Sequence, residues 1–417
     1  MYKKTVLNNG VRVITESLPH VYSVSLGIWV ESGSREENSS NNGISHFIEH
    51  MLFKGTENRS ALEIAREVES VGGTINAFTS REYTFFYAKV LKEHLRLASE
   101  ILCDIFLNSL FDEGEIEKEK DVVCQEILMI EDNPEDHIHD FLYTTMWPNN
   151  SLGMPVQGMQ KTVRSFTRDS VCDYFTSPFN KAGIIIIAVG NVDHDEVLSI
   201  FSGPFDSSKF TKEEIGKKKP EQSCGIFVQK RDIEQVHLCI GMPGPGKRDS
   251  HRYPAFVLNA ILGSGMSSRL FQEAREKRGL VYSIYSSIST FGDSGMFKIY
   301  AGTTPNKVAD LMSVIADVLA EIRKSDLTDG ELRRAKEQIK GNLLINFEST
   351  DFRLTRLASN EMYFGTHIPP DEVSRQIDEV TKGDVLGFGH NALREDRAVV
   401  AAIGNISSDD IGAKGFG

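Results

Sequence analysis

The sequence predicts an α+β protein made of two similar domains, and the main observation is a long internal repeat. The buried-type strand Gly183–Val192 is matched 214 residues later by Arg397–Ile406. Both strands end in a Gly-Asn turn, and each follows a segment with helical character. A strand-rich start also recurs, as Val6–Thr15 and Ser23–Glu31 in the first half and as Gly225–Gln229 and Gln235–Met242 in the second. Because strand type, turn and order all repeat, two related domains explain the pattern better than two unrelated ones.

The segment between the two repeats has the composition of an exposed linker. Its centre, FTKEEIGKKKPEQS, is polar, rich in lysine and contains Pro220. We therefore expect a first domain over residues 1–210, a linker over 211–223 and a second domain over 224–417.

Composition is that of a globular protein and excludes some classes of partner. The 417 residues are 40% hydrophobic and 25% charged, with a net charge of -13, which disfavours nucleic acid as a partner. No segment approaches 18 apolar residues, so we expect no membrane insertion. Five cysteines without a C-x-x-C pair indicate reduced thiols. The first residues show no secretory or transit segment. We expect a cytoplasmic protein, with a bacterial source favoured and a mature mitochondrial matrix form as the alternative.

The five residues HFIEH, from His46 to His50, suit a catalytic zinc site. On a helix, positions four apart share one face, so His46 and His50 can place two imidazoles on one metal. Glu49 falls in the same arc and can reach a metal-bound water without being a ligand. The alternative is a solvated helix that carries two histidines and a glutamate by chance. A third ligand is needed to decide between them.

A second predicted helix, within Asp112–Asp132, offers that ligand. Glu119 and Glu126 are seven residues apart on it and share a face. A solvated acidic face explains most charges of the segment. It explains Glu126 less well, because that residue lies beside Cys124 and Ile127, in the more apolar half, where an unpaired carboxylate is costly. We therefore expect Glu126 to be buried against a cation, and Glu119 to hold a ligand histidine by its free ring nitrogen.

HFIEHMLFKGT, followed by the distant EKDVVCQEI, resembles the inverted zinc-site metallopeptidases, the inverzincins. Within them it resembles the pitrilysin/insulinase family, most closely the mitochondrial-processing-peptidase branch and its bacterial homologues. The resemblance implies that His46, His50 and Glu126, which lies 76 positions past His50, bind one Zn²⁺ per chain. It also implies that Glu49 is the general base and that Glu119 is an additional active-site glutamate. The implied fold is two homologous domains, each an antiparallel-rich sheet covered by helices.

The second half lacks the metal motif but carries another feature of the family. The corresponding segment, Tyr253–Phe271, contains no histidine, so we expect one site per chain. Active members have an Arg and a Tyr seven apart that bind the substrate and polarise the scissile carbonyl, and Arg275 and Tyr282 match. Arg278 and Tyr285 have the same spacing, but the preceding LFQE favours the first pair. On spacing alone, an ordinary basic helix end followed by a strand tyrosine explains the pattern equally well.

A substrate-binding edge strand is predicted after Gly72 and Gly73. Two glycines and an extended run, followed by the alternating strand Tyr83–Val90, suit an edge strand to which an extended peptide adds by main-chain hydrogen bonds. The family uses this segment in that way, which makes Ala77, Phe78 and Thr79 candidate substrate-binding residues. A simple hairpin is the alternative.

The function expected from these features is that of a zinc-dependent endopeptidase acting on unfolded peptides or leader segments. In the family, four domains form a closed chamber. A two-domain chain must dimerise to form one, so we expect a homodimer in which Arg275 and Tyr282 act on the partner's zinc. Two alternatives stay open: a catalytic subunit that needs a different partner chain, and a non-catalytic structural or binding subunit of the same fold.

Overall fold

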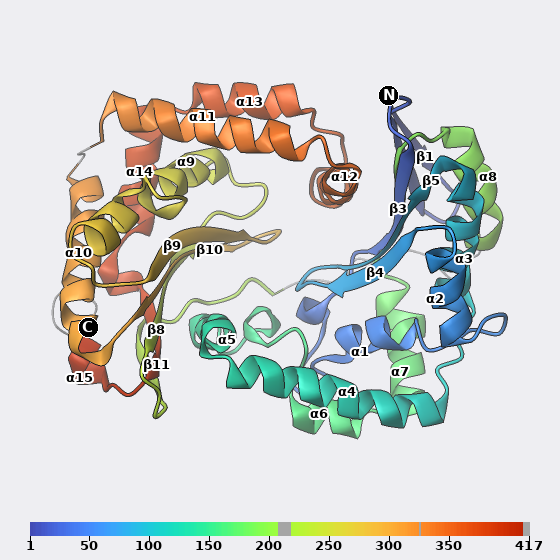
Figure 1. Ribbon diagram of the computed structural model, residues 1–417, viewed down its shortest axis with the longest axis horizontal. Coiled ribbons are helices and arrows are strands. Elements are labelled where there is room, and N and C mark those ends of the chain that lie inside the picture. The colour runs from blue at the N-terminus through green and yellow to red at the C-terminus, as the bar shows by residue number, and fades with distance from the viewer. Residues whose placement is uncertain (207–217, 325–326, 412–417) are drawn as a thin grey trace. The chain divides into compact units, whose positions relative to one another are not determined.

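The computed structural model describes residues 1–206, 218–324 and 327–411. The chain forms two compact units, each assembled from separate segments (Figure 1). The N-terminal unit comprises Met1–Met129, Met154–Lys218 and Asn346–His367. The C-terminal unit comprises Ile130–Gly153, Lys219–Ile345 and Ile368–Gly417.

The N-terminal unit is built on a six-stranded sheet of order β1-β2-β6-β3-β5-β4. Its strands are β1 (Tyr2–Val6), β2 (Arg12–Ser17), β3 (Ser23–Val30), β4 (Thr74–Thr79), β5 (Thr84–Leu91) and β6 (Ile184–Gly190). All neighbouring strands are antiparallel except β2 and β6. Strand β4 therefore lies at the edge of the sheet, as the sequence predicts for this segment.

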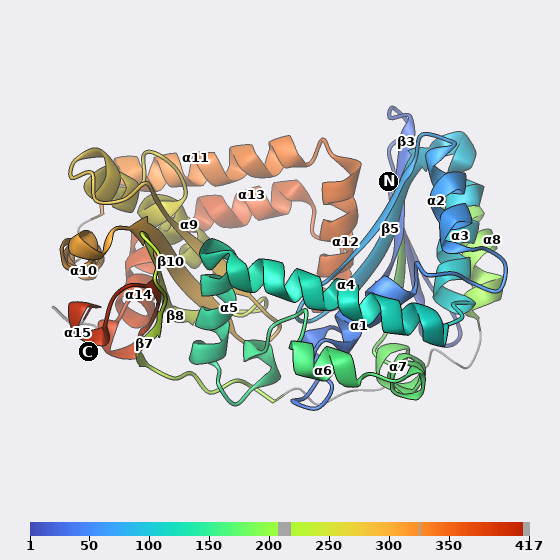
Figure 2. The same ribbon diagram turned by 60° about the horizontal axis from the view of Figure 1, so that its bottom comes forward.

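Both faces of this sheet are covered, which explains the continuous apolar run of β6. Ile184 and Ile186 face a helical layer, and Ile185 and Ile187 face the single helix α12 (Thr350–Phe364), because successive residues of a strand point to opposite faces. Figures 1 and 2 show α12 on the opposite side of the sheet from α2, α3 and α8. The helices of the layer are α1 (Ile44–Met51), α2 (Ala61–Glu69), α3 (Leu95–Leu107), α4 (Glu113–Asp132), α6 (Gln160–Ser165), α7 (Arg168–Tyr174) and α8 (His194–Phe205).

The C-terminal unit repeats this plan with five strands, in the order β7-β11-β8-β10-β9. Its strands are β7 (Gly225–Lys230), β8 (Val236–Gly244), β9 (Ser283–Thr290), β10 (Gly295–Thr303) and β11 (Val399–Gly404). One face packs on helices, and α5 (Pro134–Met146) covers the other. The remaining helices are α9 (Arg252–Gly263), α10 (Val308–Arg323), α11 (Asp329–Asn346), α13 (Pro370–Glu379), α14 (Lys382–Ala392) and α15 (Ser408–Ile411).

The two sheets confirm that the chain is an α+β protein with two related halves. The order β2-β6-β3-β5-β4 in one matches β7-β11-β8-β10-β9 in the other, and in each case the first pair is the parallel one. The N-terminal sheet has β1 in addition.

The halves exchange one helix each. Helix α5 from the first half of the sequence packs on the C-terminal sheet, and α12 from the second half packs on the N-terminal sheet. The compact units are therefore discontinuous, whereas the sequence predicts the contiguous domains 1–210 and 224–417. Residues 211–217 of the predicted linker lie outside the described residues, and residues 218–223 have no regular secondary structure. In the part of the chain that the structure describes, no helix combines the length and apolar character needed to cross a membrane.

Candidate metal centre

Helix α1 carries the HFIEH motif and begins where only glycine fits. Gly43, at its N-terminus, has φ of 95°, and a Cβ there would lie 2.7 Å from the carbonyl oxygen of Gln157. Phe47, Ile48 and Met51 point into the core and hold the inner face of the helix. The histidines and Glu49 are thereby left on its partly exposed face.

Glu37 caps this helix from the preceding loop. Its Oε2 accepts a hydrogen bond from Gly43 N at 2.7 Å, and its Oε1 accepts one from Ser45 N at 2.9 Å. These bonds replace the side-chain cap that glycine cannot supply. Burial raises the pKa of Glu37 to about 7, against the effect of the hydrogen bonds from Gly43 and Ser45. Sequence reasoning missed this residue because its role depends on the path of the loop.

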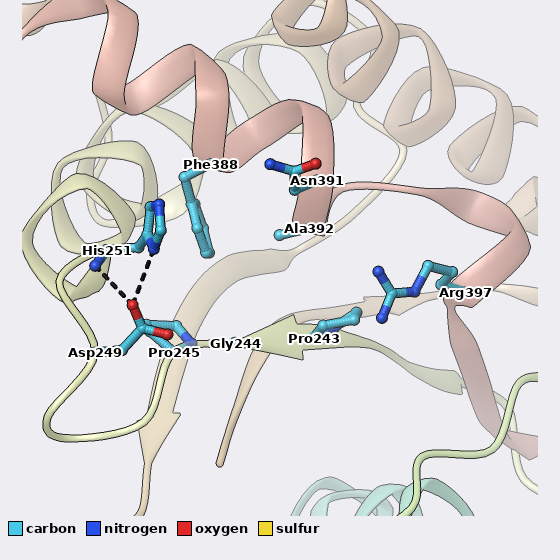
Figure 3. Close-up of a pocket in the computed structure, with 9 residues that line it drawn as sticks. All are labelled: Pro243, Gly244, Pro245, Asp249, His251, Phe388, Asn391, Ala392 and Arg397. Carbon is cyan, nitrogen blue, oxygen red and sulfur yellow. Dashed lines mark hydrogen bonds and ion pairs between the residues drawn. The ribbon is translucent and has the colours of Figure 1, made fainter. Parts of the chain in front are cut away.

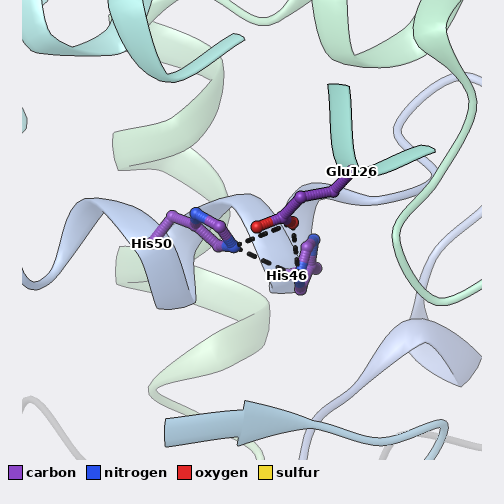
Figure 4. Close-up of side chains that lie close together, drawn as sticks. All are labelled: His46, His50 and Glu126. Carbon is purple, nitrogen blue, oxygen red and sulfur yellow. Dashed lines mark hydrogen bonds and ion pairs between the residues drawn. The ribbon is translucent and has the colours of Figure 1, made fainter. Parts of the chain in front are cut away.

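Three side chains converge at one point (Figure 4). Nε2 of His46 lies 3.2 Å from Nε2 of His50, and Oε2 of Glu126 lies 3.4 Å from His50 Nε2 and 3.8 Å from His46 Nε2. Tetrahedral zinc with bonds of about 2.0–2.2 Å sets its ligand atoms roughly 3.3–3.6 Å apart, and the three observed separations lie within about 0.2 Å of that range. Among the residues that the structure describes, this is the one group of three or more His, Cys, Asp or Glu side chains close enough to share a metal.

Helix α4 brings Glu119 to the other side of His50. Its Oε1 accepts a hydrogen bond from His50 Nδ1 at 2.8 Å, and its Oε2 lies 2.6 Å from Nζ of Lys54. An acceptor at the second ring nitrogen fixes the tautomer that leaves Nε2 free to bind a metal. Sequence reasoning did not find Lys54. No pattern in the sequence indicates this contact, because Lys54 and Glu119 lie on elements that are distant in the sequence.

The exposure of Glu126 differs from the sequence-based expectation that this residue is buried. The Glu119 side chain is 3% exposed, whereas that of Glu126 is 41% exposed. The apolar neighbours of Glu126, Cys124 and Ile127, are buried in the core on the inner face of α4. The expectation of a buried Glu126 was therefore wrong, because adjacent helical residues face different directions.

Opposite charges define the electrostatics of the group. Burial opposes protonation of His50, but hydrogen bonds to Glu119 and Glu126 outweigh it and raise the pKa of His50. Burial lowers the pKa of His46, and the positive charge of His50 lowers it further. The hydrogen bond to His50 keeps the pKa of Glu126 below its usual value. Two imidazoles flanked by two ionised carboxylates form a donor set that attracts a divalent cation.

Glu49 lies beside this group without belonging to it. Its Oε2 accepts a hydrogen bond from Oγ1 of Thr79, the last residue of edge strand β4, at 2.5 Å. Burial raises the pKa of Glu49, and the hydrogen bond from Thr79 opposes the shift. The sequence predicts that Thr79 binds substrate, and in the structure its hydroxyl already has a partner within the protein.

The other two candidates on β4 are partly buried. Ala77 packs against the main core, and the ring of Phe78 lies 5.8 Å from that of Tyr83 and 6.2 Å from that of Tyr87, between centroids. Their role in substrate binding stays a prediction.

Arg275 and Tyr282 lie together in the C-terminal unit. Arg275 Cζ is 5.4 Å from the centre of the Tyr282 ring, and Tyr282 is 83% exposed. The rival pair has other partners. Arg278 forms an ion pair with Glu273 at 2.5 Å, and a hydrogen bond of 3.0 Å joins the Tyr285 hydroxyl to a ring nitrogen of His139. These contacts favour Arg275 and Tyr282 as the available pair, and their catalytic role stays a prediction.

A separate pocket of about 190 Å³ lies in the C-terminal unit and contains none of the predicted site residues (Figure 3). On the wall of this pocket, Asp249 Oδ1 accepts hydrogen bonds from the backbone N–H of His251 at 2.8 Å and from its ring at 2.9 Å. The lining residues are Pro243, Gly244, Pro245, Asp249, His251, Phe388, Asn391, Ala392 and Arg397.

Two family models match the chain. Residues 12–160 match "Insulinase (Peptidase family M16)". This matched segment includes the HFIEH motif and Glu126. Residues 165–339 match "Peptidase M16 inactive domain". The second model agrees with the missing metal motif in the second half of the sequence.

Bacterial proteins named as zinc proteases are similar over nearly the whole chain. The "uncharacterized zinc protease YmxG" of Bacillus subtilis is 41% identical over 410 residues, which cover 98% of this chain and 100% of the relative. An uncharacterized zinc protease of Streptomyces coelicolor is 39% identical and covers 94% of this chain and 87% of its own length. An uncharacterized zinc protease of Rickettsia felis is 39% identical, and the match covers 91% of this chain and 92% of the relative.

Solved structures share the fold at low sequence identity. A protease from Helicobacter pylori superposes with a TM-score of 0.89 and 20% identity, over 97% of this chain and 99% of that one. A peptidase M16 inactive domain from Pseudomonas fluorescens gives a TM-score of 0.89 and 19% identity, over 97% and 98%.

Proposed function

This chain belongs to the insulinase family of peptidases, family M16, and from that premise we propose that it is a zinc-dependent endopeptidase. The observation that carries the proposal is the spacing of His46 Nε2, His50 Nε2 and Glu126 Oε2, with Glu49 beside them. Three protein ligands leave a fourth position open for water or substrate, which is the pattern of catalytic rather than structural zinc.

These three residues would hold one zinc ion per chain. When bound, zinc supplies Lewis acidity, which makes an attacking water more acidic and polarises a carbonyl oxygen. The neighbouring hydrogen bond between Glu119 and His50 orients the imidazole for this task.

Glu49 would be the general base. Its carboxylate takes a proton from the attacking water and gives it to the leaving amine. Burial raises its pKa, which makes it a better proton acceptor than a solvated glutamate, and the Thr79 hydroxyl holds it in place. Because Glu49 is not one of the three ligand side chains, its carboxylate can accept and donate the proton without any change in metal coordination.

Arg275 and Tyr282 would stabilise the oxyanion that develops on the peptide carbonyl. Both are donors, and the Tyr282 side chain is open to solvent and so open to a ligand. We propose a homodimer in which the pair of one chain acts at the metal centre of its partner, as the two-domain length and the family's four-domain chamber suggest.

The substrate class that we propose is an unfolded peptide or a leader segment. Edge strand β4 has a neighbouring strand on one side only, so an extended chain can add along its other side, and its last residue contacts Glu49. A folded protein cannot add a strand in this way unless a segment of it is extended.

Cleavage of an unstructured peptide by the purified chain tests the proposal. We expect cleavage that stops when a chelator removes the metal and returns when zinc is added back. His46→Gln should abolish both zinc binding and cleavage, whereas His251→Gln, a matched change at an exposed histidine in the C-terminal unit, should alter neither. Cleavage that survives complete metal removal would contradict the proposal.

Mixing two inactive variants tests the homodimer. Glu49→Gln lacks the base, and Arg275→Ala lacks the oxyanion donor. If each active site combines residues of two chains, mixed dimers contain one intact site, so activity should partly return. No return of activity, despite measured exchange of subunits, would count against the trans arrangement.

A further inference from the structure

We propose that Lys54 is a positioning residue of the metal centre and acts through Glu119. The inference rests on the proposed function, because it takes His50 to be a metal ligand. Nζ of Lys54 lies 2.6 Å from Oε2 of Glu119, whose Oε1 accepts the hydrogen bond from His50 Nδ1 at 2.8 Å. The three side chains form one chain of charge-assisted contacts that ends at the imidazole.

The backbone after α1 places the ammonium group where Glu119 needs it. The helix ends at Met51, and the N–H of Lys54 bonds to the carbonyl oxygen of Met51 at 3.0 Å. This turn sets Lys54 just past the end of the helix, while Glu119 comes from α4. Both partners of the carboxylate, His50 and Lys54, therefore belong to one stretch of five residues.

The burial of Glu119 makes this second partner necessary. Its side chain is 3% exposed, and a carboxylate removed from water is costly unless each oxygen is hydrogen-bonded. The imidazole satisfies one oxygen, and Lys54 satisfies the other. Without Lys54, Oε2 of Glu119 would lack a hydrogen-bond partner. The Glu119 side chain would then rotate towards solvent to hydrogen-bond with water, and this rotation would break its hydrogen bond to His50.

Loss of the hydrogen bond between Glu119 and His50 would weaken the binding of the metal. The acceptor at Nδ1 fixes the tautomer and orientation of a ligand histidine, and removing such an acceptor commonly weakens metal affinity by about 10–100-fold. The Lys54 side chain is 30% exposed. The alternative to a positioning role is therefore a solvated lysine that contributes only a surface ion pair. The two roles differ in whether zinc affinity depends on Lys54.

Zinc affinity of the folded chain, measured by competition with a chromophoric chelator, separates the two roles without an activity assay. We expect Lys54→Met to weaken zinc binding about ten-fold. Lys54→Arg, which keeps a cation, should retain most of the wild-type affinity. Lys118→Met, the same change at a 71% exposed lysine on α4, should have no effect. Lys54→Gln repeats the test if the Met variant fails to fold.

A double-mutant cycle shows whether Lys54 acts through Glu119. In a Glu119→Gln background, Lys54→Met should cause little further loss, because the group that it positions is already gone. Wild-type zinc affinity in Lys54→Met, or an equal loss in both backgrounds, would overturn the inference while leaving the proposed function intact. A wild-type chain that binds no zinc would instead overturn the proposed function.

Discussion

Thr79 Oγ1 lies 2.5 Å from Oε2 of Glu49, so the last residue of edge strand β4 is hydrogen-bonded to the carboxylate that would move the proton. The two residues are 30 positions apart in the sequence. The contact joins the strand to which an extended peptide would add with the helix that carries His46 and His50. One hydrogen bond would therefore link the strand that binds the peptide to the carboxylate that acts in its cleavage.

Thr79→Val should lower kcat about ten-fold and leave both KM and zinc affinity near their wild-type values. The valine lacks the hydroxyl that orients Glu49, and a hydrogen bond to a charged group contributes about 1.5–3 kcal/mol. Thr79→Ser keeps the hydroxyl and should retain kcat. Steady-state kinetics on one peptide checks the split. If Thr79 acts by binding substrate instead, KM rises while kcat holds.

The exchanged helix α12 is tied to the N-terminal sheet by a buried carboxylate. Glu361 is 3% exposed, and its Oε1 lies 2.7 Å from Nζ of Lys4 on β1 and 3.4 Å from Nη1 of Arg12 on β2. Glu361→Gln removes the carboxylate from Lys4, whereas Arg12 keeps its ion pair with Glu31 at 2.6 Å. The change should lower the free energy of unfolding by about 1.5–3 kcal/mol.

Fluorescence of Trp29 isolates this effect. The chain has two tryptophans, and a Trp147→Phe background leaves Trp29, which packs beside α12, as the sole probe of denaturant unfolding. Glu348→Gln, at an exposed glutamate just before α12, is the matched control and should not change the midpoint. Equal midpoints for the two variants would show that the ion pair contributes little.

The pairing of Arg269 with Glu331 predicts a loss of stability in acid. Burial opposes ionisation of Glu331, but hydrogen bonds from Arg269 and Thr328 outweigh it and lower its pKa from 4.5 to about 2. The stabilisation is therefore complete above pH 4.5 and is lost as the pH falls towards about 2, because the unfolded chain takes up the proton first. Glu331→Gln should be less stable than wild type at pH 7, and this difference should shrink across that range in denaturant titrations. A constant difference would contradict the assignment.

Glu126→Gln should reduce zinc binding although Glu126 is the more exposed of the two glutamates. The amide has no negative charge and is a poorer zinc ligand than a carboxylate. Zinc content and competition with a chelator check this outcome. Glu113→Gln, at an exposed position of the same helix, is the control and should bind zinc as wild type does.

The sequence predicts the repeated architecture well, because strand runs and their turns recur at a fixed distance. It does not reveal the exchange of α5 and α12. Apolar residues such as Leu354 and Leu357 indicate that α12 has a buried face, but not which sheet covers it. Helix exchange depends on the path of the connecting segments, which local patterns do not encode.

Within the candidate site, spacing along single helices is the predictable part. His46 and His50 share a helical face by periodicity, and the resemblance locates Glu126. The contacts of Lys54 and Thr79 were not predictable, because each joins elements distant in sequence. Those contacts hold the carboxylates of Glu119 and Glu49 in place.

A comparison of wild type with Glu49→Gln tests the central claim most directly, by measuring zinc content and peptide cleavage on the same preparations. Our account predicts that the variant keeps one zinc per chain with wild-type affinity, since Glu49 is not a ligand. It also predicts that cleavage falls by about 10²–10⁴-fold, the range that a general base contributes. Undiminished cleavage by the zinc-loaded variant would contradict the account.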